Sequence, residues 1–320
     1  MAATAVAVVV TRDLFASVML TGVYSLFSAC FFVLMDAVDV AFTEAAVGAG
    51  ISTLLMLATL AMTGHLEKPG GQHPLVATVV VVITGTLLIV GTIDMPVLGA
   101  GDTPVQQHLT PYYIEQAAAE TGVPNVVTAV LASYRSYDTL GETVVIFAAG
   151  LGVMLLVGTP RDTDAAPRAE LMPAAWGSHR VPRVVGKILI PPIMMFALYV
   201  QFHGDYGPGG GFQAGVIFAA AVILYALLFG AERASQALNL GVLRLLAALG
   251  VLLYGSVGIA CMLGGGSFLD FSELADDPVH GQHLGILLIE LGVGITVAAV
   301  MILIFLTLAL KVGHSERPKS

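Results

Sequence analysis

Acidic side chains inside apolar stretches are the residues of this sequence most able to do chemistry. Glu44 and Glu142 each lie within a turn or two of a second acid, Asp39 and Asp138, and Glu290 lies deep in the last apolar run. An acidic residue near the middle of a membrane helix costs about 2.5 to 3.5 kcal/mol, so such residues usually face inward and serve a function. A carboxylate away from water can exchange a proton or a cation, so ion or proton movement is the chemistry that these positions predict.

Glu44 is followed at helical spacing by Gly48 and Ser52, so a strip of small residues shares its face. Such a strip allows a neighbouring helix to approach closely around the carboxyl group. Gly48 and Gly50 also weaken the helix, which predicts a bulge or a rewound turn just after Glu44. The alternative is that Glu44 only caps its helix near one end.

Asp138 and Glu142 are one helical turn apart at the start of another apolar run. We expect Asp138 to cap the helix that follows, and Glu142 to lie on the same face, one turn deeper. The alternative is that both acids only complement the positive end of this helix. Arg135 is predicted to pair with one of them.

Glu290 lies two helical turns after His283, about 10 Å further along the same face of a helix. Before His283 come three further titratable residues, Asp276, Asp277 and His280. A series of this kind that leads to a carboxylate in an apolar run is typical of a proton or cation entry path. The alternative is that Glu290 bonds a neighbouring helix.

A glycine-rich segment from His203 to Gly215 lies between two apolar runs and predicts a tight reversal of the chain. It lacks the Lys-Ser/Thr pair of a phosphate-binding loop. His203 and Asp205 at this turn either stabilise it or take part in ion handling. Gly211 and Gly215, four residues apart, predict a close helix contact.

The composition identifies an integral membrane protein, since 57% of the residues are hydrophobic and only 11% are charged. The mean hydropathy is +0.89, and the two cysteines have no metal-ligand or disulfide spacing. Strand alternation is absent, so we predict an all-α polytopic fold with two helical bundles and about eight spans. The predicted spans are 14–35, 40–62, 75–93, 138–157, 186–203, 211–230, 241–263 and 284–310.

The basic residues predict the orientation. If the loops alternate between the two sides of the membrane, all of the 13 Lys and Arg residues except Arg135 fall on one side. Lys and Arg favour cytoplasmic loops, so both termini are expected in the cytoplasm of a cell whose inner (plasma) membrane holds the chain. The acids collect on the outer side, and the net charge of -9 gives no reason to expect a nucleic-acid partner. Residues 1–11 are too short for a span and either belong to a longer helix or lie along the membrane.

Four segments resemble one family of membrane complexes. The run from Asp39 to Gly50 resembles the carboxy-terminal membrane domain of the large subunit of Mrp-type Na+/H+ antiporters and a small subunit of membrane-bound hydrogenases. The segment from Asn125 to Glu142 resembles a second block of that domain. The segments His203–Gly215 and Gly281–Gly294 resemble the B subunit of the same antiporters.

The resemblance implies three parts: a large-subunit-like domain at 1–157, a cytoplasmic linker at 158–185 and a B-like four-helix domain at 186–320. It implies a coupling or non-pumping subunit of a multisubunit antiporter, with other subunits as partners and with Na+ and H+ transported rather than held as cofactors. The expected ion-binding residues are Glu44, Glu142, Glu290, His283, Asp39, Asp138 and His203. The alternatives are a membrane-arm subunit of a hydrogenase-like redox complex and a scaffold subunit.

Overall fold

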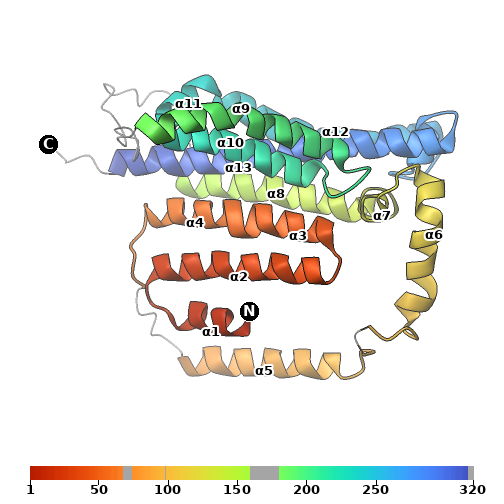
Figure 1. The fold of residues 1–320 in the computed structure, drawn as a ribbon, viewed down its shortest axis with the longest axis horizontal. Helices are drawn as coiled ribbons and strands as arrows, with labels where there is room; N and C mark the ends of the chain where they lie inside the picture. The colour runs from red at the N-terminus through yellow and green to blue at the C-terminus, as the bar shows by residue number, and fades with distance from the viewer. Residues whose placement is uncertain (68–73, 98, 159–179, 316–320) are drawn as a thin grey trace.

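The computed structural model describes residues 1–67, 74–97, 99–158 and 180–315, and in these ranges the chain is helical (Figure 1). Among these described residues, eight helices are long and apolar enough to cross a membrane, which confirms the all-α polytopic prediction. Their bounds agree with the predicted spans to within a few residues in most cases. They are α2 (Leu14–Leu34), α3 to α4 (Val38–Leu60), α5 (Pro74–Thr92), α8 (Ser136–Val157), α9 (Arg180–His203), α10 (Gly211–Phe229), α12 (Leu240–Gly264) and α13 (Pro278–Ser315).

Shorter elements connect these spans. The helix α6 runs across the ends of the spans instead of along them (Figure 1). The helix α1 lies beside α2 and runs along it, and Ser17 Oγ of α2 donates a hydrogen bond to the carbonyl oxygen of Val8 over 3.5 Å. The short elements are α1 (Ala2–Val10), η2 (Val105–Leu109), α6 (Thr110–Thr121), α7 (Val126–Thr128), η3 (Ala129–Tyr134), α11 (Ala231–Ala237) and η4 (Phe271–Leu274).

The core of the protein is the long helix α13, on which α8, α10 and α12 pack. Glycines allow backbone to meet backbone along it. A Cβ atom at Gly215 would lie 2.7 Å from the carbonyl oxygen of Gly294, and one at Gly292 would lie 2.7 Å from that of Gly250. The close contact predicted for Gly211 and Gly215 is therefore confirmed, and its partner is α13.

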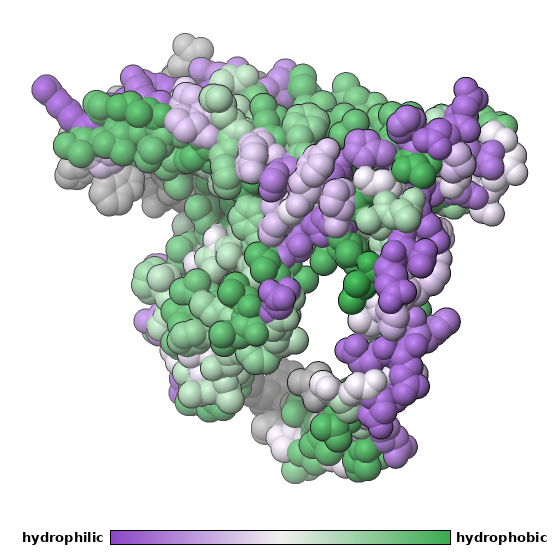
Figure 2. Space-filling model, turned by 45° about the vertical axis from the view of Figure 1, so that its right-hand side comes forward, coloured by the Kyte–Doolittle hydropathy of each residue, from purple (hydrophilic) through white to green (hydrophobic). Residues whose placement is uncertain are grey.

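The amino-terminal spans form a second, looser layer. The helices α2, α3 and α4 pack together, whereas α5 stands apart from them and is joined to the core through α6 (Figure 1). None of the residues of α5 from Leu75 to Thr92 is buried inside the chain. An opening lies between α5 and the other spans (Figure 2).

The helix α9 begins at Arg180, earlier than the predicted span at residue 186. Its basic first turns are accommodated because Arg183 and Lys187 lie over the ring of Phe229, at 5.4 and 5.5 Å from the ring centre. A cation over an aromatic face is attracted by the ring. Most of the predicted linker, residues 159–179, lies outside the described residues, so the domain boundaries remain a prediction.

Candidate functional site

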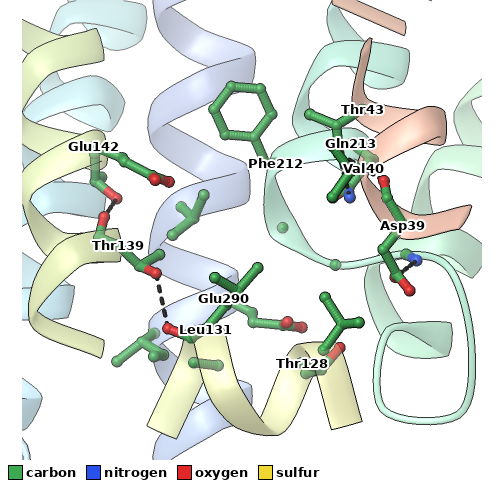
Figure 3. A pocket seen from close by; sticks show the side chains of 18 of the residues that line it. Asp39, Val40, Thr43, Thr128, Leu131, Thr139, Glu142, Phe212, Gln213 and Glu290 are labelled. Carbon is green, nitrogen blue, oxygen red and sulfur yellow. Dashed lines mark hydrogen bonds between the residues drawn. The ribbon is translucent and has the colours of Figure 1, made fainter. Parts of the chain in front are cut away.

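A cavity of about 530 Å³ is lined by acidic side chains from three distant parts of the chain, and we call it the carboxylate cavity. Asp39 of α3, Glu142 of α8 and Glu290 of α13 all line it. Figure 3 shows Glu290 between Glu142 on one side and Asp39 on the other. The structure therefore brings together three of the seven residues that the sequence predicted as ion-binding.

Glu290 is placed by the glycine-rich turn. Gly210 has a φ of +116°, a conformation that glycine adopts without strain, and a Cβ atom there would lie 3.1 Å from Glu290 Oε1. The next residue, Gly211, packs on the backbone of Glu290, where a Cβ atom would overlap the carbonyl oxygen. The turn therefore leaves room for the carboxylate and for the close contact of α10 with α13.

Asp39 is held by hydrogen bonds from two other segments. Its Oδ1 accepts from Asn125 Nδ2 at 3.3 Å and from the backbone N–H of Gly209 at 3.4 Å. Asn125 also donates to the carbonyl oxygens of Gly204 and Gly207, each at 3.1 Å, and its own Oδ1 caps α7. Asn125 thus connects Asp39 of α3 to the glycine-rich turn through hydrogen bonds.

Neutral polar side chains also line the cavity, and they were not among the residues predicted from the sequence. Gln213 Nε2 donates to Thr43 Oγ1 at 2.7 Å, and Thr128 Oγ1 donates to the carbonyl oxygen of Gly204 at 2.7 Å. Thr139 Oγ1 donates to the carbonyl oxygen of Leu131 at 2.8 Å (Figure 3). A signal was present for Gln213, which lies inside the Gly-rich motif, but threonines in apolar helices are too common to single out.

Glu44 does not line this cavity. It ends α3, and the π-helix η1 (Ala45–Ser52) follows directly, which confirms the predicted rewinding after Glu44. The carboxylate lies on the α2 side, because a Cβ atom at Gly48 would be 2.7 Å from Glu44 Oε1 and 2.6 Å from Ser25 Oγ. No hydrogen bond to the Glu44 carboxylate is present among the described residues.

Asp138 does not cap a helix, so that prediction was wrong. It is the third residue of α8, whose cap position is Arg135, and no side chain caps this end. Asp138 instead pairs with Arg135, with Oδ2 at 2.5 Å from Nη2 and 2.7 Å from Nε. The predicted partner for Arg135 is thus confirmed, because a spacing of three residues at the start of α8 brings the two side chains together.

His283 faces Asp205 instead of Glu290. The distance from His283 Nε2 to Asp205 Oδ2 is 2.9 Å, and Asp205 is buried in the glycine-rich turn. Nearer the start of α13, His280 Nδ1 lies 3.3 Å from Asp277 Oδ2. The titratable groups before Glu290 therefore form two pairs, His280 with Asp277 and His283 with Asp205. Asp205 belongs to the loop before α10 and was not part of the predicted series.

His203 lies away from the carboxylate cavity. Its ring stacks on Tyr199 with 4.8 Å between the ring centres, and its Nε2 borders Gly207. It lines a second cavity of about 540 Å³ with residues of α2 and α3 such as Cys30 and Ala41. This packing favours the first of the two roles predicted for His203, which is to stabilise the turn.

Family models match three consecutive parts of the chain. Residues 181–303 match a domain described as related to the MnhB subunit of a Na+/H+ antiporter. Residues 1–65 match the MbhD model and residues 78–168 match the MbhE model, each of which describes one subunit of MBH.

Individual relatives give the same assignment. The chain is 36% identical over 130 residues to the putative antiporter subunit mnhB2 of Staphylococcus aureus (strain Newman), covering 92% of that protein and 40% of this chain. It is 26% identical over 318 residues to a probable K(+)/H(+) antiporter A/B subunit of Rhizobium meliloti, covering 92% of this chain. It spans only 32% of that longer relative.

A solved structure extends the likeness to the whole fold. The chain superimposes on a chain of the Mrp complex from Dietzia sp. DQ12-45-1b with a TM-score of 0.74 and 26% sequence identity. The match covers 100% of this chain and 34% of the other. The chain therefore belongs to the family of Mrp/Mnh antiporter subunits, in which it joins a B-type domain to a part related to the large subunit.

Proposed function

We propose that this chain is a coupling subunit of a multisubunit antiporter that exchanges a monovalent cation, Na+ or K+, for protons. Its role in the assembly is to form part of the ion path, with Na+ or K+ and H+ as the transported species and no resident cofactor. The names of its relatives support antiport as the activity, and the carboxylate cavity supports a direct part in it. We propose further that the chain is a transporter component and catalyses no covalent reaction.

The observation that carries this proposal is the meeting of Asp39, Glu142 and Glu290 at one cavity. Glu142 and Glu290 lie within helices that cross the apolar region, where an unused carboxylate would be costly, and Asp39 lies in the first turn of α3. Because they come from three separate spans, no requirement of local helix stability explains why they share one space. Carboxylates that line one cavity can pass a cation or a proton from one to the next, and the two species compete for the same oxygens.

The exposed surface of the chain supports the assignment to a larger assembly. The span α5 has no buried residue between Leu75 and Thr92 and is held at a distance from α2 to α4 (Figures 1 and 2). We propose that helices of other subunits pack between α5 and the rest of this chain.

The matches of residues 1–65 and 78–168 to MBH subunits favour a second candidate function, that of a membrane-arm subunit of a redox complex. Copurification of subunits that carry Fe–S clusters would select that candidate.

The orientation is also a proposal, with both termini in the cytoplasm. In a variant without Cys30 and Cys261, a cysteine at the exposed position Gln236 of α11 should react with membrane-impermeant reagents only from the cytoplasm. A cysteine at the exposed position Asp276, in the loop before α13, should react only from outside. The reverse pattern would refute the orientation.

The central experiment measures cation-dependent proton movement in membrane vesicles that contain the complete complex. Glu290→Gln keeps the size of the side chain but removes the exchangeable charge, so exchange should be lost while assembly is retained. Glu115→Gln, a matched change at an exposed position of α6, should leave exchange unchanged. Normal exchange in the Glu290→Gln complex would refute the proposed ion path.

A further inference from the structure

A third hollow, distinct from the carboxylate cavity and from the cavity beside His203, opens on the apolar flank of the carboxy-terminal bundle. This groove has a volume of about 390 Å³ and is lined by residues of α9, α10, α12 and α13. Residues at its rim are exposed, for example Leu198 at 53% and Phe202 at 60% on α9, and Leu291 at 39% on α13. The groove is therefore accessible from the surroundings of the spans.

One polar side chain interrupts this apolar lining. Among the described residues that line the groove, only Gln201 carries a polar side chain. Gln201 is 6% exposed, and its Nε2 is buried without a hydrogen-bond partner in the described part of the chain. Its amide lies over Gly294, where a Cβ atom would overlap Gln201 Oε1, so the absence of a side chain at Gly294 makes room for it.

An unpartnered buried amide destabilises the folded state unless an acceptor reaches it. A bound water molecule would need two to four polar partners, and the groove lining offers only Gln201. An otherwise apolar molecule that carries one acceptor would satisfy this amide and fill the apolar groove.

The position and length of the groove indicate which apolar molecule fits. Gln201 is two residues from the end of α9 at His203, about 3 Å along the helix axis, and so lies near the boundary of the hydrocarbon region. Along α13 the groove extends from Leu291 to Ile302, a rise of about 16 Å. That length is close to half of a hydrocarbon core of about 30 Å, which is one leaflet.

We propose that the groove binds one glycerophospholipid, with an acyl chain along α13 and an ester carbonyl oxygen that accepts a hydrogen bond from Gln201. The ester carbonyls of a phospholipid lie at the hydrocarbon boundary, at the level of Gln201, and its acyl chain spans one leaflet. Only one acyl chain of the lipid needs to enter the groove, and such a chain is much narrower than a partner helix, whose diameter is about 10 Å.

The test uses the purified complex that contains the full chain, in detergent and depleted of lipid. A phosphatidylcholine with a photoreactive diazirine on its acyl chain is the probe, and unlabelled dioleoyl phosphatidylcholine competes with it as either the ester or the ether analogue. The ether analogue lacks the carbonyl acceptor, so the ester should compete about three- to tenfold better. In Gln201→Leu this difference should vanish, whereas Gln116→Leu, a matched change on the exposed face of α6, should retain it.

A second variant tests the place of binding. Ala298→Phe puts a ring into the groove and should abolish photolabelling of the neighbouring peptide of α13, while Gln116→Leu keeps it. If Ala298→Phe disturbs assembly, the competition in Gln201→Leu, whose side chain has a similar size, still decides the question. Equal competition by ester and ether analogues in the wild-type complex would overturn the proposal. Absence of labelling in α13 would also overturn it and would show that protein covers the groove.

Discussion

Gln213 Nε2 donates a hydrogen bond to Thr43 Oγ1 over 2.7 Å, and this contact joins α10 to α3 across 170 residues of the chain. Gln213 is 7% exposed, so its amide depends on this partner. The contact lies in the wall of the carboxylate cavity and connects the two parts of the molecule that different family models describe.

Thr43→Val should therefore destabilise the complex by about 1 to 3 kcal/mol, because it leaves the Gln213 amide buried and unpaired. Gln213→Leu in the same chain should restore part of this loss, with a coupling of about 0.5 to 3 kcal/mol. A double-mutant cycle of thermal unfolding measures this coupling. Strictly additive effects of the two changes would show that the hydrogen bond does not hold the two parts together.

Gly210→Ala should impair ion exchange through its contact with Glu290. Gly210 and Gly265 both have positive φ, +116° and +107°, so alanine at either position introduces backbone strain of about 1 to 3 kcal/mol. Only at Gly210 does the new Cβ atom meet Glu290 Oε1, at 3.1 Å, whereas Gly265 has no neighbour within 4 Å among the described residues. Both variants should lose thermal stability, but cation-dependent proton movement should fall only in Gly210→Ala. Equal transport in the two variants would contradict the proposed role of the turn.

His283→Ala and Asp205→Asn should have similar effects on transport, since the two side chains form one pair at 2.9 Å. Removing either leaves the other without its partner, so the double variant should be no worse than the single ones. The measurement is the pH profile of exchange in vesicles for all three variants. A double variant that is much worse than either single one would show that the two residues act independently.

Glu44→Gln should abolish exchange, and Glu44→Asp should retain part of it, if this carboxylate must ionise on the α2 side of the molecule. The amide has nearly the shape of the acid but cannot exchange a proton. Vesicle assays with Glu232→Gln as the matched control decide this, with assembly checked by copurification. Full exchange in Glu44→Gln would show that the residue serves only to end α3 before η1.

Glu120 should control the ionisation of two tyrosines on the surface helix α6 and on η3. Tyr112 and Tyr134 both donate hydrogen bonds to its carboxylate. The hydrogen bond to Glu120 raises the pKa of Tyr112 above 10.0, and burial followed by the same kind of hydrogen bond raises the pKa of Tyr134. The folded-state pKa values are raised, so this stabilisation is present below pH 10 and is lost as the pH rises through them.

Glu120→Gln should therefore shift both tyrosine titrations toward 10.0, and Tyr112 more completely, since Tyr134 keeps the contribution of burial. The ultraviolet absorbance of phenolate follows the titration, and the difference between variant and wild type isolates these two residues. Glu115→Gln on the same helix serves as the control. Identical curves for Glu120→Gln and wild type would refute the link.

The amino-acid sequence by itself determined the class of the protein, the number of its spans and most of their ends. It could do so because each span must bury its backbone in helical hydrogen bonds and cover itself with apolar side chains, a requirement that every stretch meets locally. Local chemistry also determined the rewound helix after Glu44 and the close contact at Gly215. The start of α9 was predicted too late because an aromatic ring on another helix, Phe229, accommodates its basic first turns.

Only the tertiary structure decided which acids meet. The sequence predicts Glu44 as an ion-binding residue, yet its side chain faces α2. Asp39, five residues earlier, instead lines the carboxylate cavity with Glu142 and Glu290. Two residues that are five positions apart on a helix lie on different faces of it. Which of these faces meets the core depends on how α3 packs against α10. The pairing of His283 with Asp205 likewise depends on the position of the loop between α9 and α10. That position cannot be predicted from the spacing of residues within α13.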